Sequence, residues 1–109
     1  MYMASSPQTA LDLLVLTVLD RRGALHGYAI ANAISDLSAE ALQIEEGSLY
    51  PALHRMEESG WISAEWTMTE KKRRARIYAI TKPGKKQLDA ESTRWAAFTG
   101  GVARVLKHA

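Results

Sequence analysis

The hydrophobic residues near the start of the chain recur at the spacing of an amphipathic helix. The stretch "TALDLLVLTVLDRRG" has apolar side chains at i, i+3, i+4, i+7 and i+8, with Thr9 as a predicted N-cap and Gly23 after the predicted end. Leu13 and Leu16 lie off that face, so the helix is apolar over more of its circumference than a surface helix of a monomer needs. We therefore expect it to pack on a second chain. Its main face consists of Leu11, Leu14, Val15, Val18 and Leu19.

The stretch "LHGYAIANAISDLS" predicts a second, shorter helix. Ile30, Ile34 and Leu37 lie at i, i+4 and i+7, so all three are expected on one buried face. The alanines between them permit close packing against a neighbouring helix.

The stretch "EEGSLYPALHRMEESG" predicts a third helix, in which Leu49, Leu53 and Met56 repeat the same spacing. Gly60 lies where a residue in the left-handed conformation ends a helix. Pro51 is expected near the first turn, because deeper in a helix its missing N–H and its ring would cost about 3 kcal/mol.

Two short runs rich in aromatic and β-branched residues, "WISAEW" and "ARIYAIT", follow the third helix. Ile62, Ala64 and Trp66 alternate on one face of the first run, and Tyr78 and Ile80 lie on one face of the second. The tract between the two runs, "TMTEKKRR", is therefore predicted to form the tip of a β-hairpin.

The remaining segment, "KPGKKQLDAESTRWAAFTGGVARVLKHA", predicts a helix of roughly 25 residues, with Thr81 as its cap and Pro83 in its first turn. Gly100 and Gly101 each weaken this helix by about 1 kcal/mol relative to alanine. Either they allow two backbones to approach closely at a dimer axis, or the last turn is loosely formed. Apolar residues recur every seven positions, as in a coiled coil. These are Leu88, Trp95 and Val102, with Phe98 and Val105 as a partial second row.

Three helices followed by a hairpin with a basic tip is the element order of a winged helix-turn-helix domain. The expected fold class is mainly α (α+β), with residues 1–81 as the winged helix-turn-helix and residues 82–109 as a C-terminal dimerisation helix, packed as one compact unit. A chain of 109 residues at 47% apolar can bury one modest core. Because a monomer would expose the seam of the last helix, we expect a homodimer. The predicted dimerisation residues are Leu14, Val18, Leu88, Trp95, Phe98, Val102 and Val105.

The charges are divided unevenly along the chain. Residues 1–60 contain three basic and eight acidic side chains, whereas residues 61–109 contain eleven basic and four acidic ones. The cations crowd at the hairpin tip, where water and salt soften their mutual repulsion and a polyanion would neutralise them. A solvated loop without a partner is the alternative interpretation. The crowded cations are Lys71, Lys72, Arg73, Arg74 and Arg76.

Several classes of protein find no support in the sequence. Cysteine is absent, which excludes a disulfide scaffold and a thiolate zinc site and indicates a cytoplasmic protein. No stretch has the pattern of a signal peptide or a membrane span. His26, His54 and His108 are predicted on separate elements, and the acidic pairs at 45–46 and 57–58 are adjacent in sequence, so their side chains do not converge. We therefore expect neither an enzyme nor a metal or cofactor site.

Four strings, "LHGYAI", "GSLYPALHRMEESGWI", "RARIYAIT" and the Pro-Gly that follows, resemble the PadR family of bacterial transcriptional regulators, in particular its short members with one C-terminal helix. The resemblance extends over residues 10–106 and implies a dimeric, DNA-binding repressor. Two features differ from many family members. The hairpin tip has Glu70, Lys71 and Lys72 in place of glycine and neutral residues, and Glu45 and Glu46 precede the third helix.

The resemblance favours DNA contacts for the polar side chains of the third helix. Ser48, Tyr50 and His54 would read base edges, while the hairpin tip and the start of the second helix would hold phosphates. Solvent-facing side chains without a contact are the alternative for Tyr50 and His54, and a core aromatic is the alternative for Tyr28. The predicted DNA contacts are Tyr28, Ser48, Tyr50, His54, Arg55, Lys71, Lys72, Arg73, Arg74 and Arg76.

Trp95 has two interpretations. Members of the PadR family can place a tryptophan on the last helix at a dimer cleft that accepts flat aromatic effectors, whereas the alternative is a large residue that fills the dimer seam. The leading hypothesis is a ligand-responsive homodimeric repressor that binds a palindromic operator in double-stranded DNA and releases it when a small aromatic or hydrophobic effector shifts the last helix. Two alternatives are a winged-helix module whose basic wing docks an acidic protein, and a protein that coats nucleic acid regardless of sequence.

Overall fold

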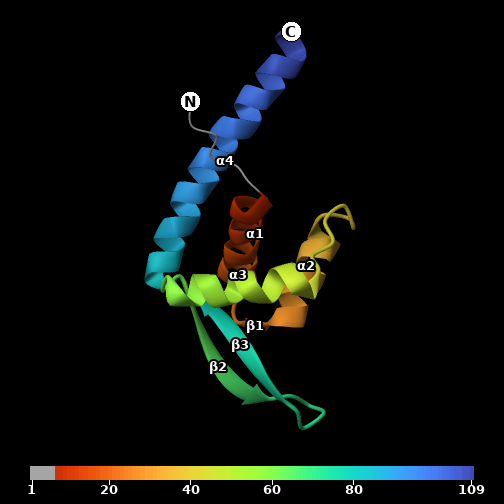
Figure 1. The fold of residues 1–109 in the computed structure, drawn as a ribbon, viewed down its shortest axis with the longest axis vertical. Helices are drawn as coiled ribbons and strands as arrows, with labels where there is room; N and C mark the ends of the chain where they lie inside the picture. The colour runs from red at the N-terminus through yellow and green to blue at the C-terminus, as the bar shows by residue number, and fades with distance from the viewer. Residues whose placement is uncertain (1–6) are drawn as a thin grey trace.

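The structure, a computed structural model, describes residues 7–109, in which the chain forms four helices and a three-stranded sheet (Figure 1). Three helices precede a β-hairpin and a long helix follows it, as the sequence predicts, with one additional short strand after the first helix. In chain order the elements are α1 (Pro7–Arg22), β1 (Leu25–His26), α2 (Gly27–Leu37), α3 (Glu46–Glu58), β2 (Ile62–Met68), β3 (Arg74–Ile80) and α4 (Lys82–His108).

Helix α1 is the central element of the core. Val15 and Leu16 have no exposed surface, and α1 packs against α2, α3, β3 and α4 of the same chain. The chain itself therefore covers Leu16, and the expectation that this residue requires a second chain is wrong. Helix α1 begins at Pro7, a residue suited to a first helical position, so Thr9 lies inside the helix and is not its N-cap. Gly23, with a φ of 84°, follows its end as predicted.

Helix α2 buries Ile30 and Ile34 as predicted, but Leu37 is 63% exposed. Leu37 is the last residue of the helix, and the chain turns away after it through Ala39 and Glu40, which both have positive φ. The prediction that Leu37 belongs to the buried face is wrong, because the helix ends before this position reaches a neighbouring element.

Helix α3 begins at Glu46, which is earlier than expected from a proline in the first turn. Pro51 lies in the second turn and not near the first. Pro51 and Gly47, whose carbonyl loses its helical donor, are both exposed, so water can satisfy that carbonyl and the proline is tolerated. Gly60, with a φ of 79°, follows the helix as predicted. The buried stripe contains the three predicted residues and one alanine: Leu49, Ala52, Leu53 and Met56.

The strands form an antiparallel sheet in the order β1-β3-β2. Strands β2 and β3 pair from Ile62 opposite Ile80 at the base to Met68 opposite Arg74 near the tip, so the predicted hairpin is confirmed. Strand β1 was not predicted, because two residues carry no periodicity. The base of the hairpin lies in the core, where Tyr78 is 5% exposed, whereas Met68 at the outer end is 65% exposed.

Helix α4 is attached to the body at its N-terminal end. The Thr81 hydroxyl accepts a hydrogen bond from the Gly84 N–H at 3.1 Å, so the predicted cap is confirmed, and the Thr81 N–H donates to the Trp61 carbonyl at 3.0 Å. A Cβ at Gly84 would overlap the same carbonyl oxygen, so glycine alone fits there. The helix then continues through its Gly-Gly pair to His108 and extends away from the other elements (Figure 1).

The fold is therefore mainly α (α+β), a winged helix-turn-helix followed by a long C-terminal helix, as the sequence predicts. The core gathers residues of all four helices together with the base of the hairpin. Within residues 7–109, none of the helices combines the length and the apolar character needed to cross a membrane.

Candidate nucleic-acid interface

The outer face of α3 consists of the residues that its buried stripe leaves in solvent. Tyr50 and His54 are exposed and lie four positions apart, so they share one side of the helix. Ser48 is also exposed but lies in the first turn, two positions before Tyr50, so it is about 160° away from Tyr50 around the helix, on the other flank of the buried stripe. The structure thus brings Tyr50 and His54 together and places Ser48 nearer the start of the helix.

Tyr50 is held against the start of α2. A Cβ at Gly27 would lie 2.8 Å from both Cε1 and Oη of Tyr50, so the ring occupies the space that a side chain at position 27 would need. Gly27 is the first residue of α2, where unpaired N–H groups favour an anion. Tyr50 therefore joins the outer face of α3 to the N-terminus of α2. Periodicity did not predict this contact, and the glycine itself was the one signal in the sequence.

The exposed charges at the two ends of α3 are acidic. Glu45 and Glu46 are exposed at its start, and the Glu58 Oε1 atom lies 2.9 Å from Nε2 of His54 at its end. The side chains of Glu58 and His54 are 68% and 70% exposed, respectively. Positive charge for a polyanion must therefore come from elements next to α3.

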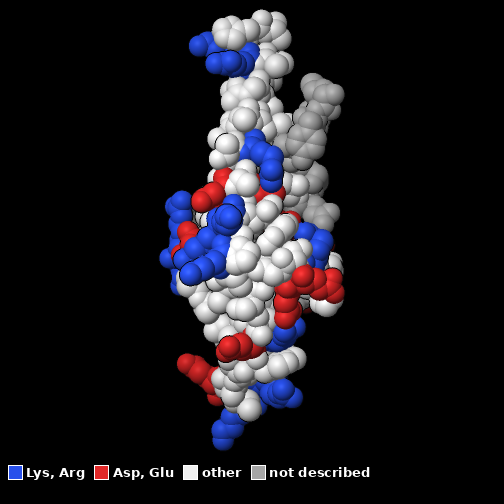
Figure 2. Space-filling model, turned by 90° about the vertical axis from the view of Figure 1, so that its left-hand side faces the viewer, with Lys and Arg blue, Asp and Glu red and all other residues white. Residues whose placement is uncertain are grey.

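We call β2, β3 and the turn between them the wing. Lys71, Lys72 and Arg73 lie in its turn and are exposed, and no ion pair joins them to another residue of the described range 7–109. Thr69 orders this turn: its N–H donates to the Arg73 carbonyl at 2.8 Å, and its hydroxyl accepts from the Arg73 N–H at 3.2 Å. Figure 2 shows Lys and Arg side chains at the lower end of the molecule, where the tip of the wing lies in Figure 1, with acidic side chains beside them.

Trp66, on the wing behind the turn, is 59% exposed and has two guanidinium groups over its ring. The Cζ atoms of Arg74 and Arg76 lie 4.8 and 5.6 Å from the ring centroid, within the range of a cation–π contact. Arg76 also forms an ion pair with Glu57 of α3 at 2.8 Å. Arg76 is therefore tied to α3, whereas Arg74 remains exposed with the cations of the turn.

A groove of about 760 Å³ separates the start of α2 from the wing. His26 and Tyr28 line one side, with their rings stacked at a centroid distance of 5.7 Å, and Nε2 of His26 lies 3.0 Å from Oγ1 of Thr67. Tyr28 is 57% exposed, so its interpretation as a core aromatic is wrong. The groove also has cations of the wing among its lining residues, namely Lys71, Arg73 and Arg74.

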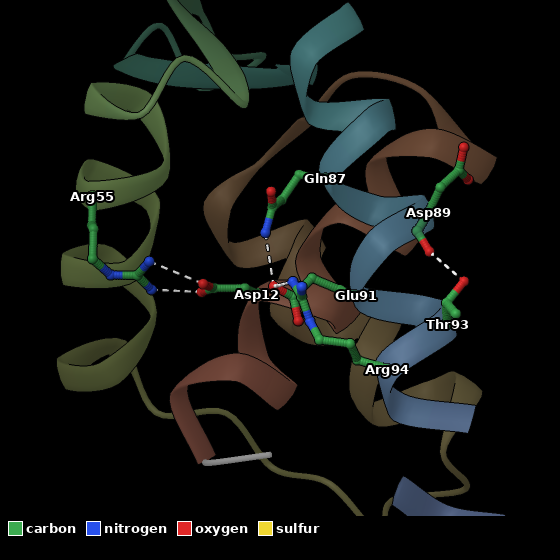
Figure 3. Close-up of polar contacts among 7 residues, drawn as sticks. All are labelled: Asp12, Arg55, Gln87, Asp89, Glu91, Thr93 and Arg94. Carbon is green, nitrogen blue, oxygen red and sulfur yellow. Dashed lines mark hydrogen bonds and ion pairs between the residues drawn. The ribbon is translucent and has the colours of Figure 1, made fainter. Parts of the chain in front are cut away.

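Arg55 contacts α1. Its Nη1 and Nη2 atoms donate to Oδ2 and Oδ1 of Asp12 at 2.9 and 2.6 Å, in a bidentate pair (Figure 3). Asp12 is 6% exposed, and the Arg55 side chain is 35% exposed. The hydrogen bonds from Arg55 to Asp12 favour the charged guanidinium and raise the pKa of Arg55 above its ordinary value. The structure thus separates Arg55 from the other predicted DNA contacts.

Helix α4 carries a buried acidic group and an aromatic pair. Gln87 and Arg94 donate to Oε1 of Glu91 at 2.7 and 2.8 Å, whereas Oε2 of Glu91 is buried and has no hydrogen-bond partner among residues 7–109 (Figure 3). Further along the helix, Trp95 and Phe98 are half-buried, with ring centroids 5.9 Å apart. The residue predicted to bind an effector therefore has an aromatic neighbour.

The residues predicted to form a dimer surface fall into two groups. Val18 and Leu88 are 4% and 9% exposed and belong to the core of the single chain, so they are not available as a surface. Along the C-terminal half of α4 exposure increases, to 80% at Leu106. The predicted residues that keep exposed area are Leu14, Trp95, Phe98, Val102 and Val105.

The outer face of α3, the groove and the wing carry groups suited to binding a ligand. Among residues 7–109, no group of three or more His, Asp or Glu side chains could hold a metal ion. His26, His54 and His108 lie on β1, α3 and α4, which are separate elements. The wing supplies cations and the outer face of α3 supplies hydrogen-bonding groups, which can contact phosphates and base edges, while the carboxylates at the two ends of α3 cannot neutralise a phosphate.

The element order, the exposed face of α3 and the basic wing define a winged helix-turn-helix protein of the kind that regulates transcription. Residues 15–90 match the model of the transcriptional regulator PadR-like family, and the chain belongs to this family. The family is one of transcriptional regulators and not of enzymes, so the expectation that this chain is not an enzyme is confirmed.

Solved structures of transcriptional regulators agree with this assignment, and the chain is also similar to a relative known by its sequence. A transcriptional regulator from Clostridium thermocellum superposes with a TM-score of 0.80 at 28% identity, covering 89% of this chain and 93% of that one. Bacillus subtilis PadR, solved in complex with operator DNA, has a TM-score of 0.68 at 26% identity, over 78% of this chain and 46% of that one. An uncharacterised 37.1 kDa protein of transposon TN4556 from Streptomyces fradiae is 38% identical over 91 residues, which are 84% of this chain. The chain spans about a quarter of that relative, 24% of its length.

Proposed function

We propose that this regulator is a homodimer that binds double-stranded DNA at a palindromic operator and represses transcription there. The observation that carries the proposal is the turn of the wing, where Lys71, Lys72 and Arg73 are exposed and form no ion pair with another described residue. Such cations repel one another until a polyanion neutralises them. The Bacillus subtilis PadR that was solved with operator DNA supports a DNA ligand for this fold.

In the proposed interface, base edges and phosphates are contacted by different elements. Helix α3 enters the major groove and reads base edges through Ser48, Tyr50 and His54, which are exposed. The wing and the start of α2 hold phosphates, which fixes the register without reading sequence. The groove between Tyr28 and the wing supports this division, because it places three cations, with Glu70 beside them, opposite a helix N-terminus.

The proposed dimer forms through α4. Val102 and Val105 are 41% and 66% exposed on a helix that extends beyond the core, and burying them against a second copy would remove apolar surface from water. A two-fold dimer would present two α3 helices to half-sites about 34 Å apart, one turn of DNA. In this arrangement, residues 1–81 act as the DNA-binding part and residues 82–109 as the dimerisation helix of one unit.

An effector site is proposed beside Trp95. Its ring is half-buried, it pairs with Phe98, and such a pair can stack on a flat aromatic molecule. A shift of α4 on binding would change the distance between the two α3 helices and release the operator. A protein with this function acts in the cytoplasm.

Selection from a random duplex library tests the proposed function. We expect enrichment of a palindrome, and we expect Ser48→Ala or His54→Ala to change the preferred bases while the wing is intact. Equal recovery of all sequences would instead indicate that the protein coats nucleic acid regardless of sequence.

A winged-helix module for protein–protein contact is a second candidate, and the charge of α3 favours it. The exposed charged residues at the ends of this helix, Glu45, Glu46 and Glu58, repel a phosphate backbone, which would leave the basic wing to dock an acidic protein. The two functions differ in their response to salt. Binding of duplex DNA that is weak and hardly changes with salt would favour the protein-contact module.

A further inference from the structure

We propose that Asp12 and Arg55 form a positioning element for α3: their ion pair fixes the rotation of this helix about its axis, and Arg55 does not itself contact DNA. The inference rests on the proposed function, because it assigns a role within the DNA-binding surface. It differs from the sequence-based expectation, which grouped Arg55 with the DNA contacts.

The geometry of the pair is directional. Two parallel hydrogen bonds, at 2.9 and 2.6 Å, join the two terminal nitrogens of Arg55 to the two oxygens of Asp12. A bidentate fork of this kind fixes angle as well as distance, whereas a single-point contact fixes distance alone. The apolar stripe of α3 provides attraction but little direction, so the ion pair is the contact with α1 that sets the orientation of the helix.

Because Asp12 is buried, breaking its ion pair with Arg55 would be costly. Asp12 is 6% exposed, so its carboxylate is removed from water and needs its donors. Arg55 therefore cannot move outward to a phosphate without leaving that carboxylate unpaired. A second ion pair, between Glu57 and Arg76, ties the same helix to β3. Together the two pairs attach α3 to α1 on one side and to the wing on the other.

Because Arg55 lies on the same helix as Tyr50 and His54, the ion pair with Asp12 also sets the orientation of these two side chains. Arg55 follows His54 directly, and successive residues of an α-helix are separated by about 100°. A rotation of α3 that lengthens the contact with Asp12 would therefore move His54 and Tyr50 by the same angle. Base-edge hydrogen bonds depend steeply on such displacements.

The closing experiment measures affinity for a selected duplex, as a function of salt, for the wild-type chain, Arg55→Lys and Asp12→Asn. Lysine keeps a charge that can contact a phosphate but cannot form the fork. We expect both variants to lose affinity by about tenfold, with the salt slope of the wild-type chain. The double variant should be no weaker than either single variant, because both substitutions remove the same contact.

Melting curves run in parallel test whether each variant is folded at the temperature of the titration. If Asp12→Asn is unfolded there, the affinity and salt slope of Arg55→Lys alone test the proposal. The proposal is overturned if Arg55→Lys binds like the wild type, or if Arg55→Gln flattens the salt slope by about 0.9 per lost contact. Failure of the proposed function gives a different result, because the wild-type chain would then bind no duplex preferentially.

Discussion

Tyr78 is the residue at which the wing enters the core. It is 5% exposed, and burial raises the pKa of its phenol above the ordinary value, an effect that the nearby positive charge of Arg76 partly offsets. The folded state therefore holds the phenolic proton more tightly than the unfolded state does. The stabilisation that this proton provides is complete below about pH 10, the ordinary pKa of tyrosine, and is lost as the pH rises through the raised value.

We expect the free energy of unfolding to fall, as the pH rises above about 10, by more in the wild-type chain than in Tyr78→Phe. The Phe variant has no group to ionise at this position, while all other titrating groups are the same. Urea unfolding at a series of pH values measures the difference. Parallel pH profiles for the two proteins would show that Tyr78 does not contribute.

At the scale of elements, close contacts between backbones decide how α4 leaves the core. The first turn of α4 passes the turn after α3, where the Thr81 hydroxyl donates to the Gly60 carbonyl at 2.6 Å and the Thr81 N–H to that of Trp61. Gly84 is needed because the Trp61 carbonyl fills the position of its Cβ. Gly100 lies in the same helix, and no neighbouring group of residues 7–109 comes within 4 Å of the position that its Cβ would occupy.

The two glycines should respond in opposite ways to alanine. Gly84→Ala is expected to destabilise the fold by about 3 kcal/mol, because backbone must move to admit the methyl group. Gly100→Ala, its matched control, should stabilise the helix by up to about 1 kcal/mol. Chemical denaturation measures both changes. A loss of dimer affinity in Gly100→Ala would instead show that the Gly-Gly pair allows two backbones to approach.

Periodicity predicted the elements that are long enough to show it. The stripe of α3 and the alternation of β2 and β3 follow from local spacing, and so does the cap at Thr81. Strand β1 is too short to carry a period. The roles of Arg55 and Arg76 depend on Asp12 and Glu57, partners that are distant in sequence, and no local pattern distinguishes a paired cation from a free one. The sequence also predicted too large a dimer surface. Val18 and Leu88, which were assigned to it, pack in the core of the single chain.

At the scale of the whole molecule, the proposed dimer depends on the free end of α4. Val105→Glu should weaken dimerisation at least tenfold, because it would bury an unpaired charge between the two copies. Ala103→Glu is the matched control, since it adds the same charge at an exposed position off both apolar rows. Sedimentation velocity over a range of concentrations distinguishes the two variants. A wild-type chain that sediments as a monomer at micromolar concentration would contradict the proposed dimer.

The salt dependence of duplex DNA binding by the wild-type chain shows most directly whether the wing contacts phosphates. A dimer that presents two wings, each with Lys71, Lys72, Arg73 and Arg74, predicts a slope of log Kobs against log salt between about −4 and −7. Arg73→Ala should make that slope less steep by about 2, one contact from each wing, whereas Arg104→Ala on α4 should leave it unchanged. A slope near zero for the wild-type chain, or one that Arg73→Ala does not alter, would contradict the assignment of the wing to DNA.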